Sequence, residues 1–230
     1  MENRNVENMI VSPSFRPAYK ACMSFAEDYA GQCIVLWGPS SSGKTLLLSA
    51  LCHRFQEKYP EKKVLMTTFE AFAEEYVLRW YREGNYVITP PECDLLIVDN
   101  MQFAGGREAT QEEMARLLRI LLERGGAVAM ALDRTPELLK PLMDRLQKNK
   151  IYQCRIVETQ EADRKLRSAL VKQLSGKRRL PFAVRLTLVG NRKVPICAFP
   201  GIFQKWEMLA QQGNGKLTSK EMLACLKEYG

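Results

Sequence analysis

Gly38-Pro-Ser-Ser-Ser-Gly-Lys-Thr45 matches the P-loop pattern in full: Gly, four residues of any type, Gly, Lys, then Ser or Thr. The apolar run Cys33–Trp37 precedes it and predicts a buried strand, and Lys44–Tyr59 follows with its apolar residues on one helical face. In this context the glycines let backbone N–H groups surround a phosphate, and the start of the helix adds positive potential. The stretch therefore predicts a nucleotide-binding strand, loop and helix.

The predicted ligand is ATP or ADP together with Mg²⁺. Lys44 is expected to reach the β- and γ-phosphates, and Thr45 is expected to bind the metal. The residues predicted to bind the nucleotide are Gly38, Pro39, Ser40, Ser41, Ser42, Gly43, Lys44 and Thr45.

A second nucleotide-site motif is predicted at Leu95-Leu-Ile-Val-Asp99-Asn100, an apolar strand that ends in an acid. Asp99 is expected to act on Mg²⁺ through water, and so joins Thr45 as a metal residue. ATPases of this design usually place another acid next, to orient and deprotonate the attacking water. Asn100 stands there instead, and an amide can orient water but cannot accept its proton. Asp99 and Asn100 are therefore candidate catalytic residues.

Asp133 is the third candidate catalytic residue. It follows Leu132 at the end of the next predicted strand, where a polar side chain can contact the γ-phosphate or the attacking water. An aspartate that only begins a turn before Pro136 fits the spacing nearly as well.

The first part of the chain alternates predicted strands with predicted helices, which indicates a parallel sheet covered on both faces. Ligands then bind at the carboxyl ends of the strands. The predicted strands are Cys33–Trp37, Val64–Thr67, Asp94–Val98, Ala127–Leu132 and Tyr152–Val157. Further helices are predicted at Phe69–Glu83, Thr110–Arg124 and Pro136–Leu146, with Thr110 as the N-cap of the second.

After Glu158 the pattern becomes helical, so we predict an α/β domain at residues 1–158 and a small all-α domain at 159–230. The predicted helices are Ala162–Leu174, Pro181–Val189, Phe199–Gln211 and Ser219–Tyr229. Residues 159–230 hold 14 Lys and Arg against 5 Asp and Glu, a net of +9, which leaves −1 for residues 1–158 because the whole chain carries +8. This asymmetry suggests a polyanionic partner, and a solvated basic surface explains it equally well.

Composition argues against several other classes of protein. The seven cysteines are widely spaced and form no CxxC pair, which argues against a zinc site or a disulfide framework. No apolar run reaches the ~18 residues of a membrane span, and residues 1–10 lack the build of a signal peptide. We therefore expect a cytoplasmic protein with no membrane association.

Four local matches resemble the AAA+ domain of the DnaA/Hda family of bacterial replication proteins. They are Ile10-Val-Ser-Pro-Ser-Phe-Arg16, Val64-Leu-Met-Thr-Thr-Phe-Glu-Ala-Phe72, Asp99-Asn-Met-Gln-Phe-Ala-Gly-Gly-Arg-Glu-Ala-Thr-Gln-Glu-Glu113 and Leu132-Asp-Arg-Thr-Pro136. The third is the most specific, because the family has Asp-Asp-Ile-Gln-Phe, a Gly-Lys turn, and Thr-Gln-Glu-Glu opening a helix. The resemblance implies a P-loop AAA+ sheet sandwiched by helices, followed by a helical lid domain.

The sequence departs from the family at three elements that the resemblance implies for hydrolysis. Asn100 replaces the second acid, and Cys197 is the best alignment for the sensor 2 arginine. The arginine-finger segment, Arg-Leu-x-Ser-Arg, corresponds to Arg145-Leu-Gln-Lys-Asn149, which places Asn149 or Lys150 near the finger position.

A slipped alignment would leave these elements intact. Arg145 or Arg155 would then be the finger, and Arg192 would be sensor 2.

The resemblance implies a nucleotide-dependent regulator or accessory factor of replication initiation, packing against DnaA or a second copy of itself. With three elements altered, we expect weak hydrolysis or none. Two alternatives stay open: an active Hda-type stimulator of ATP hydrolysis on DnaA, and a helicase-loader-like or DNA-binding accessory protein that uses the basic lid and the aromatic stripe of Phe72, Tyr76 and Trp80. We expect neither DnaA's C-terminal DNA-binding domain nor a sliding-clamp-binding peptide like that of Hda in residues 1–10.

Overall fold

The computed structural model describes residues 10–78, 89–147, 154–176, 179–212 and 217–229. The chain divides into two compact units. The first holds Phe15–Gln160, and the second holds Glu161–Gly230 together with the short segment Ile10–Ser14. The second unit has an apolar core of its own, separate from the two core clusters of the first.

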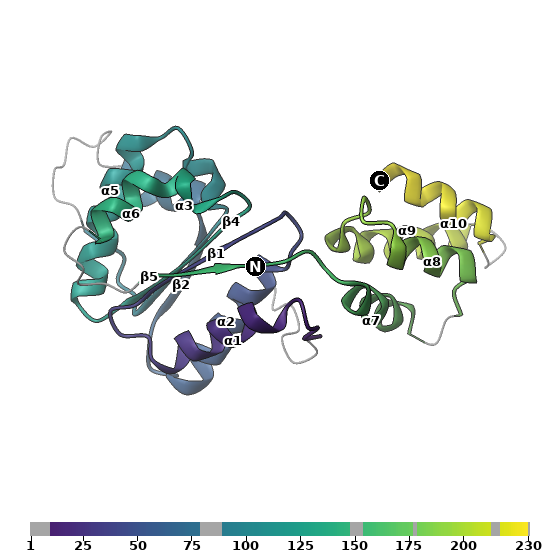
Figure 1. The fold of residues 1–230 in the computed structure, drawn as a ribbon, viewed down its shortest axis with the longest axis horizontal. Coiled ribbons are helices and arrows are strands. Elements are labelled where there is room, and N and C mark those ends of the chain that lie inside the picture. The colour runs from purple at the N-terminus through teal and green to yellow at the C-terminus, as the bar shows by residue number, and fades with distance from the viewer. Residues whose placement is uncertain (1–9, 79–88, 148–153, 177–178, 213–216, 230) are drawn as a thin grey trace. The chain divides into compact units, whose positions relative to one another are not determined.

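The first unit is built on a five-stranded parallel sheet in the order β2-β3-β4-β1-β5 (Figure 1). The strands are β1 (Cys33–Trp37), β2 (Val64–Thr68), β3 (Leu95–Asp99), β4 (Ala127–Leu132) and β5 (Cys154–Glu158). The interior strands β3 and β4 are buried along their whole length, because helices cover both faces of the sheet. Continuous apolar runs are typical of such strands.

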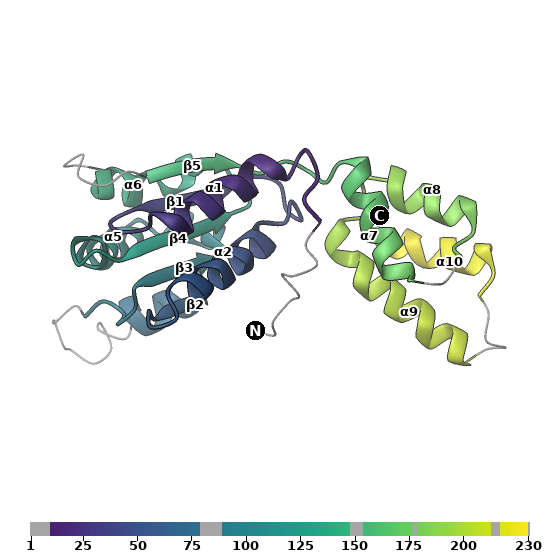
Figure 2. The same cartoon turned by 90° about the horizontal axis from the view of Figure 1, so that it is seen from below.

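Helices cover the two faces of this sheet, as Figures 1 and 2 show. On one face lie α1 (Arg16–Glu27) and α2 (Lys44–Lys58), and on the other lie α3 (Phe69–Phe72), α5 (Glu108–Glu123) and α6 (Lys140–Gln147). Successive residues of a strand point to opposite faces. Ile34 and Leu36 therefore pack with the α1–α2 core, and Val35 packs with the other core. The predicted α/β sandwich is confirmed.

Two helix predictions need correction. The helix predicted to start at Thr110 begins at Glu108, its N-cap is Arg107, and no side chain caps it. The turn before this helix ends at Gly106, whose φ is +73°. The helix therefore begins soon after it, at Glu108. The helix predicted over Pro136–Leu146 is a 3₁₀ turn, Pro136–Leu139, followed by α6.

The segment predicted as the aromatic helix Phe69–Glu83 contains α3 and then a π-helix, Ala73–Leu78. Phe72 is fully buried, and its ring stacks on Tyr76 with the centroids 5.1 Å apart. Trp80 lies outside the described residues. Phe72 therefore belongs to the core and is not exposed for stacking on a nucleic-acid base.

The described part of the second unit contains helices and no strand. Its α-helices are α7 (Arg164–Ser175), α8 (Phe182–Gly190), α9 (Phe199–Gln212) and α10 (Ser219–Leu226). Asp163 begins α7 as its N-cap, accepting a hydrogen bond from the backbone N–H of Leu166 at 2.7 Å.

Arg167 lies inside the second unit with 4% of its surface exposed. Its guanidinium donates hydrogen bonds to the backbone carbonyls of Leu188 (2.6 Å), Asn191 (2.7 Å) and Val194 (2.9 Å). It also lies over the ring of Phe199, with Cζ 5.0 Å from the centroid. This arginine therefore ties α7 to the segment that leaves α8.

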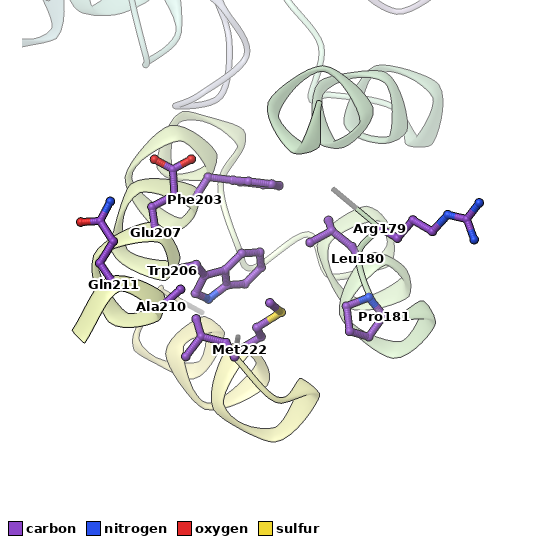
Figure 3. Close-up of a pocket in the computed structure, with 10 residues that line it drawn as sticks. Arg179, Leu180, Pro181, Phe203, Trp206, Glu207, Ala210, Gln211 and Met222 are labelled. Carbon is purple, nitrogen blue, oxygen red and sulfur yellow. The ribbon is translucent and has the colours of Figure 1, made fainter. Parts of the chain in front are cut away.

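A cavity of about 640 Å³ lies within the second unit, beside α9 and α10. Figure 3 shows Phe203, Trp206 and Met222 on one side of it and Leu180 and Pro181 on the other. Within the described residues, Nε1 of Trp206 has no hydrogen-bond partner. Nor does any helix in the described part of the chain have the length and apolar character needed to cross a bilayer.

Candidate nucleotide site

The carboxyl ends of the parallel strands bring the predicted site residues to one edge of the sheet. The P-loop follows β1, Asp99 ends β3, and Asp133 follows β4. Because β4 lies between β1 and β3, Asp133 stands between the loop and Asp99. Ligands of open α/β sheets bind at this edge.

Positive φ angles shape the P-loop. Gly38 has φ +147° and Gly43 has φ +87°. A Cβ on Gly38 would lie 2.2 Å from the carbonyl oxygen of Thr159, and one on Gly43 would lie 2.6 Å from the ring of Phe15. Both positions therefore require glycine, for space as well as for backbone conformation. Ser41 also has a positive φ, +64°, which is uncommon for a residue with a side chain.

Lys44 is the buried cation of the site, with 8% of its surface exposed. Its Nζ donates to the carbonyls of Gly38 (2.8 Å) and Pro39 (2.7 Å) and to Oγ of Ser42 (3.3 Å). Burial lowers the pKa of Lys44, and the negative charges of Asp133 and Asp99 act in the opposite direction. A phosphate at the loop would supply further negative charge to a cation that burial has taken out of water.

Thr45 and Asp99 lie in contact at the start of α2. The Thr45 hydroxyl donates to Oδ2 of Asp99 at 2.6 Å, and Oδ1 of Asp99 accepts the backbone N–H of Asn100 at 2.8 Å. Hydroxyl and carboxylate oxygens are the ligands that Mg²⁺ prefers, with phosphate oxygens and water completing its shell. The pair therefore fits the metal that accompanies a nucleotide.

Asn100 adopts the left-handed conformation, with φ +61°, which asparagine tolerates better than most residues. Its Oδ1 accepts a hydrogen bond from Nε2 of Gln102 at 3.4 Å. These contacts place Asn100 directly beside Asp99.

Asp133 carries an orphaned polar atom. Its Oδ1 is buried and has no hydrogen-bond partner in the described part of the chain, and the nearest cation paired with it, Nε of Arg134, lies 4.0 Å away. An unsatisfied buried carboxylate oxygen costs free energy unless a bound group completes it. This observation fits contact with a ligand or its water better than a simple turn.

The described candidates for the arginine finger belong to the first unit, and the candidates for sensor 2 belong to the second. Arg145 on α6 is paired with Glu112 at 2.7 Å, and Arg155 is exposed on β5. Arg192 pairs with Glu161 at 3.6 Å. Cys197 is exposed, in a 3₁₀ turn of the second unit, Ile196–Ala198. Asn149 and Lys150 lie outside the described residues, so all these assignments stay predictions.

Sequence reasoning missed Thr159, the residue directly after β5. It is 2% exposed, and its hydroxyl lies 2.6 Å from that of Ser42 in the P-loop. No motif marks it. The one signal available was its place at the carboxyl end of a predicted strand, the edge where the other site residues meet.

Comparison with known proteins gives a consistent result. The family model for the bacterial DnaA ATPase domain matches residues 1–154. The chromosomal replication initiator protein DnaA of Roseiflexus castenholzii is 31% identical over 170 residues, which cover 72% of this chain and 35% of that protein. The chain thus spans about a third of the length of such curated relatives.

Solved structures agree. Domain III of the Thermotoga maritima replication initiation protein DnaA has a TM-score of 0.81 at 21% identity, covering 97% of this chain and 95% of that one. AMPPCP-bound DnaA from Aquifex aeolicus has a TM-score of 0.71 at 25% identity, covering 91% of this chain and 66% of that one. The matched family model covers most of the chain, and the P-loop, Asp99 and Asp133 meet at one edge of its sheet: the chain belongs to the family of bacterial DnaA ATPase domains.

Proposed function

We propose that this chain is a nucleotide-binding AAA+ protein that regulates or assists the initiation of chromosomal replication, and that it hydrolyses ATP slowly or not at all. The observation that carries the proposal is the convergence of Lys44, the Thr45–Asp99 pair and the orphaned Asp133 oxygen at one sheet edge. Nucleotide binding agrees with the AMPPCP-bound relative from Aquifex aeolicus.

In the proposed complex, the P-loop N–H groups and Lys44 bind the phosphates. Thr45 and Asp99 would hold Mg²⁺. The metal would neutralise charge on the phosphate oxygens. Oδ1 of Asp133 would accept a hydrogen bond from a water molecule beside the terminal phosphate.

Several side chains support the proposal of slow hydrolysis. Asn100 cannot accept a proton from the attacking water, and general base catalysis typically contributes ~10²–10⁴-fold in rate. An arginine finger is worth ~10³–10⁵-fold. Arg145, the nearest arginine to the finger position in sequence, is already paired with Glu112 on its own chain. These losses act on one transition state, so they need not add.

The proposed role is a nucleotide-dependent contact with DnaA or with a second copy of this chain, in the manner of AAA+ packing. A protein that binds nucleotide and releases it unchanged can report nucleotide state to a partner without turning over. The proposed protein therefore differs from an active stimulator of ATP hydrolysis on DnaA, because its effect on a partner requires no ATP hydrolysis of its own.

The test combines two measurements on purified protein. Identification of any co-purified nucleotide by mass spectrometry, with ADP titration of the stripped protein, asks whether the site binds. Measurement of steady-state ATP hydrolysis asks whether the site turns over the nucleotide that it binds. We expect binding with turnover well below ~1 s⁻¹, the low end of ordinary enzymes. Turnover above that rate, lost on Arg145→Ala but retained in the exposed control Arg119→Ala, would contradict the proposal.

A second candidate function is binding of a polyanion such as single-stranded DNA, favoured by the net charge of +9 in residues 159–230. Counterion release then requires an affinity that falls steeply with salt. Binding at ~50 mM salt that weakens on charge reversal at Lys177-Arg178-Arg179 would support it. Equal binding by that variant would remove it.

A further inference from the structure

Two hydroxyl side chains that are far apart in sequence, one in the P-loop and one after β5, lie in contact. Ser42 and Thr159 are each 2% exposed, and their Oγ and Oγ1 atoms lie 2.6 Å apart. Ser42 belongs to the P-loop, whereas Thr159 follows β5 and lies two residues before the second unit begins at Glu161. A hydrogen bond between two buried hydroxyls is shielded from exchange with water.

One arrangement of protons satisfies all the contacts in this cluster. Oγ1 of Thr159 lies 3.1 Å from the carbonyl oxygen of Trp37, which can only accept. In this arrangement the one hydroxyl proton of Thr159 goes to Trp37. Thr159 then accepts from Ser42, which donates its own proton to Thr159.

With its proton committed to Thr159, Ser42 presents a lone pair to its other neighbour. That neighbour is Nζ of Lys44, a pure donor, at 3.3 Å. The result is a directed chain that runs from Lys44 to Ser42, then to Thr159, and ends at the carbonyl of Trp37. Without the Thr159 hydroxyl, the Ser42 proton would have to find another acceptor, and Ser42 would lose its fixed orientation towards Lys44.

Simple anchoring of the strand end does not need this hydroxyl. The backbone N–H of Thr159 already donates to the same Trp37 carbonyl at 2.7 Å, and β5 pairs with β1 along its length. The Thr159 carbonyl also lies against Gly38, on the side where a Cβ would clash. Backbone atoms therefore hold the loop against β5, and the side chain has a separate effect.

We infer that Thr159 is a positioning residue for nucleotide binding, which holds Lys44 in its phosphate-facing place through Ser42. The inference rests on the proposed binding of nucleotide by the P-loop. Thr159 acts through Ser42: it sets the hydrogen-bond direction of the residue that supports the phosphate-binding cation.

The test measures ADP·Mg²⁺ affinity of Thr159→Val, which keeps the branched shape and removes the hydroxyl. Loss of one neutral hydrogen bond predicts an affinity about three- to tenfold lower than wild type. Thr159→Ser keeps the hydroxyl and should bind within twofold of wild type. Thr187→Val, which removes a hydroxyl that donates to Ala183 on its own helix, is the matched control.

A double-mutant cycle with Ser42→Ala separates this role from general support of the fold, because only coupled residues depart from additivity. In the Ser42→Ala background, Thr159→Val should cause no further loss of affinity. Ser42→Ala alone, which leaves β5 untouched, should weaken binding by a similar factor even if Thr159→Val proves unstable.

Three results would overturn the inference: unchanged affinity in Thr159→Val, unchanged affinity in Ser42→Ala, or losses that simply add in the double variant. Each of them presupposes wild-type protein that binds ADP. A wild type that binds no ADP would instead remove the proposed function itself, so the two failures are distinguishable.

Discussion

Lys44 in the first unit and Arg167 in the second are both buried cations that donate to backbone carbonyls, yet their surroundings differ. Arg167 serves three carbonyls of its own unit and lies over an aromatic ring. Lys44 is the first residue of α2, directly after a loop with positive φ angles, and Asp133 and Asp99 act on its charge. Burial alone therefore does not distinguish the two cations; the buried Asp133 oxygen, which has no hydrogen-bond partner among the described residues, does.

The largest expected effect is on the structural cation. Arg167→Met should destabilise the second unit by roughly 3 kcal/mol, at about 1 kcal/mol for each carbonyl left without its donor. Chemical denaturation of the variant measures this loss, and Arg185→Met, at an exposed position on α8, is the control. A loss below about 1 kcal/mol would mean that the carbonyls find other partners and that Arg167 is not the organising group.

A smaller effect is expected at the candidate site. Asp133→Asn keeps the shape of the side chain but removes a negative charge that acts on Lys44, so the unliganded protein should lose less than about 1 kcal/mol of stability. The exposed Asp144→Asn on α6 should change little. Clear destabilisation by Asp133→Asn would indicate that Asp133 is a structural turn residue after all.

The smallest effect belongs to exposed cations. Hydrogen bonds from Lys58 and Arg54 lower the pKa of Glu27, which links α1 to α2. A lowered carboxyl pKa contributes stability that is present above the ordinary value of ~4.3 and is lost as pH falls through the folded value. Glu27→Gln should thus unfold slightly earlier than wild type at pH 7, and the difference should shrink as pH falls below ~4.3. A difference in unfolding between the two proteins that stays the same at acidic pH would show that Glu27 acts through packing and not through its charge.

Much of the fold and part of the site could be predicted from local sequence. The strands β1, β3 and β4 are short apolar runs next to Gly or Asp, and the P-loop has fixed spacing. Thr159 could not be predicted, because its contact with Ser42 depends on β5 pairing with β1. The N-cap of α5 was predicted at Thr110, whereas it is Arg107. The turn that sets this start depends on the positive φ of Gly106, which the amino-acid sequence does not reveal.

The most direct test of the central claim, that Lys44 is a ligand-binding cation, is unfolding of wild type and Lys44→Ala with and without ADP·Mg²⁺. Ligand at 100 times its Kd stabilises a protein by about 2.7 kcal/mol. We expect that gain in wild type and in Arg185→Met. Each protein is compared with itself, so Lys44→Ala should show no gain with ADP whatever its own unliganded unfolding midpoint. An equal ADP-dependent gain in Lys44→Ala would contradict the account.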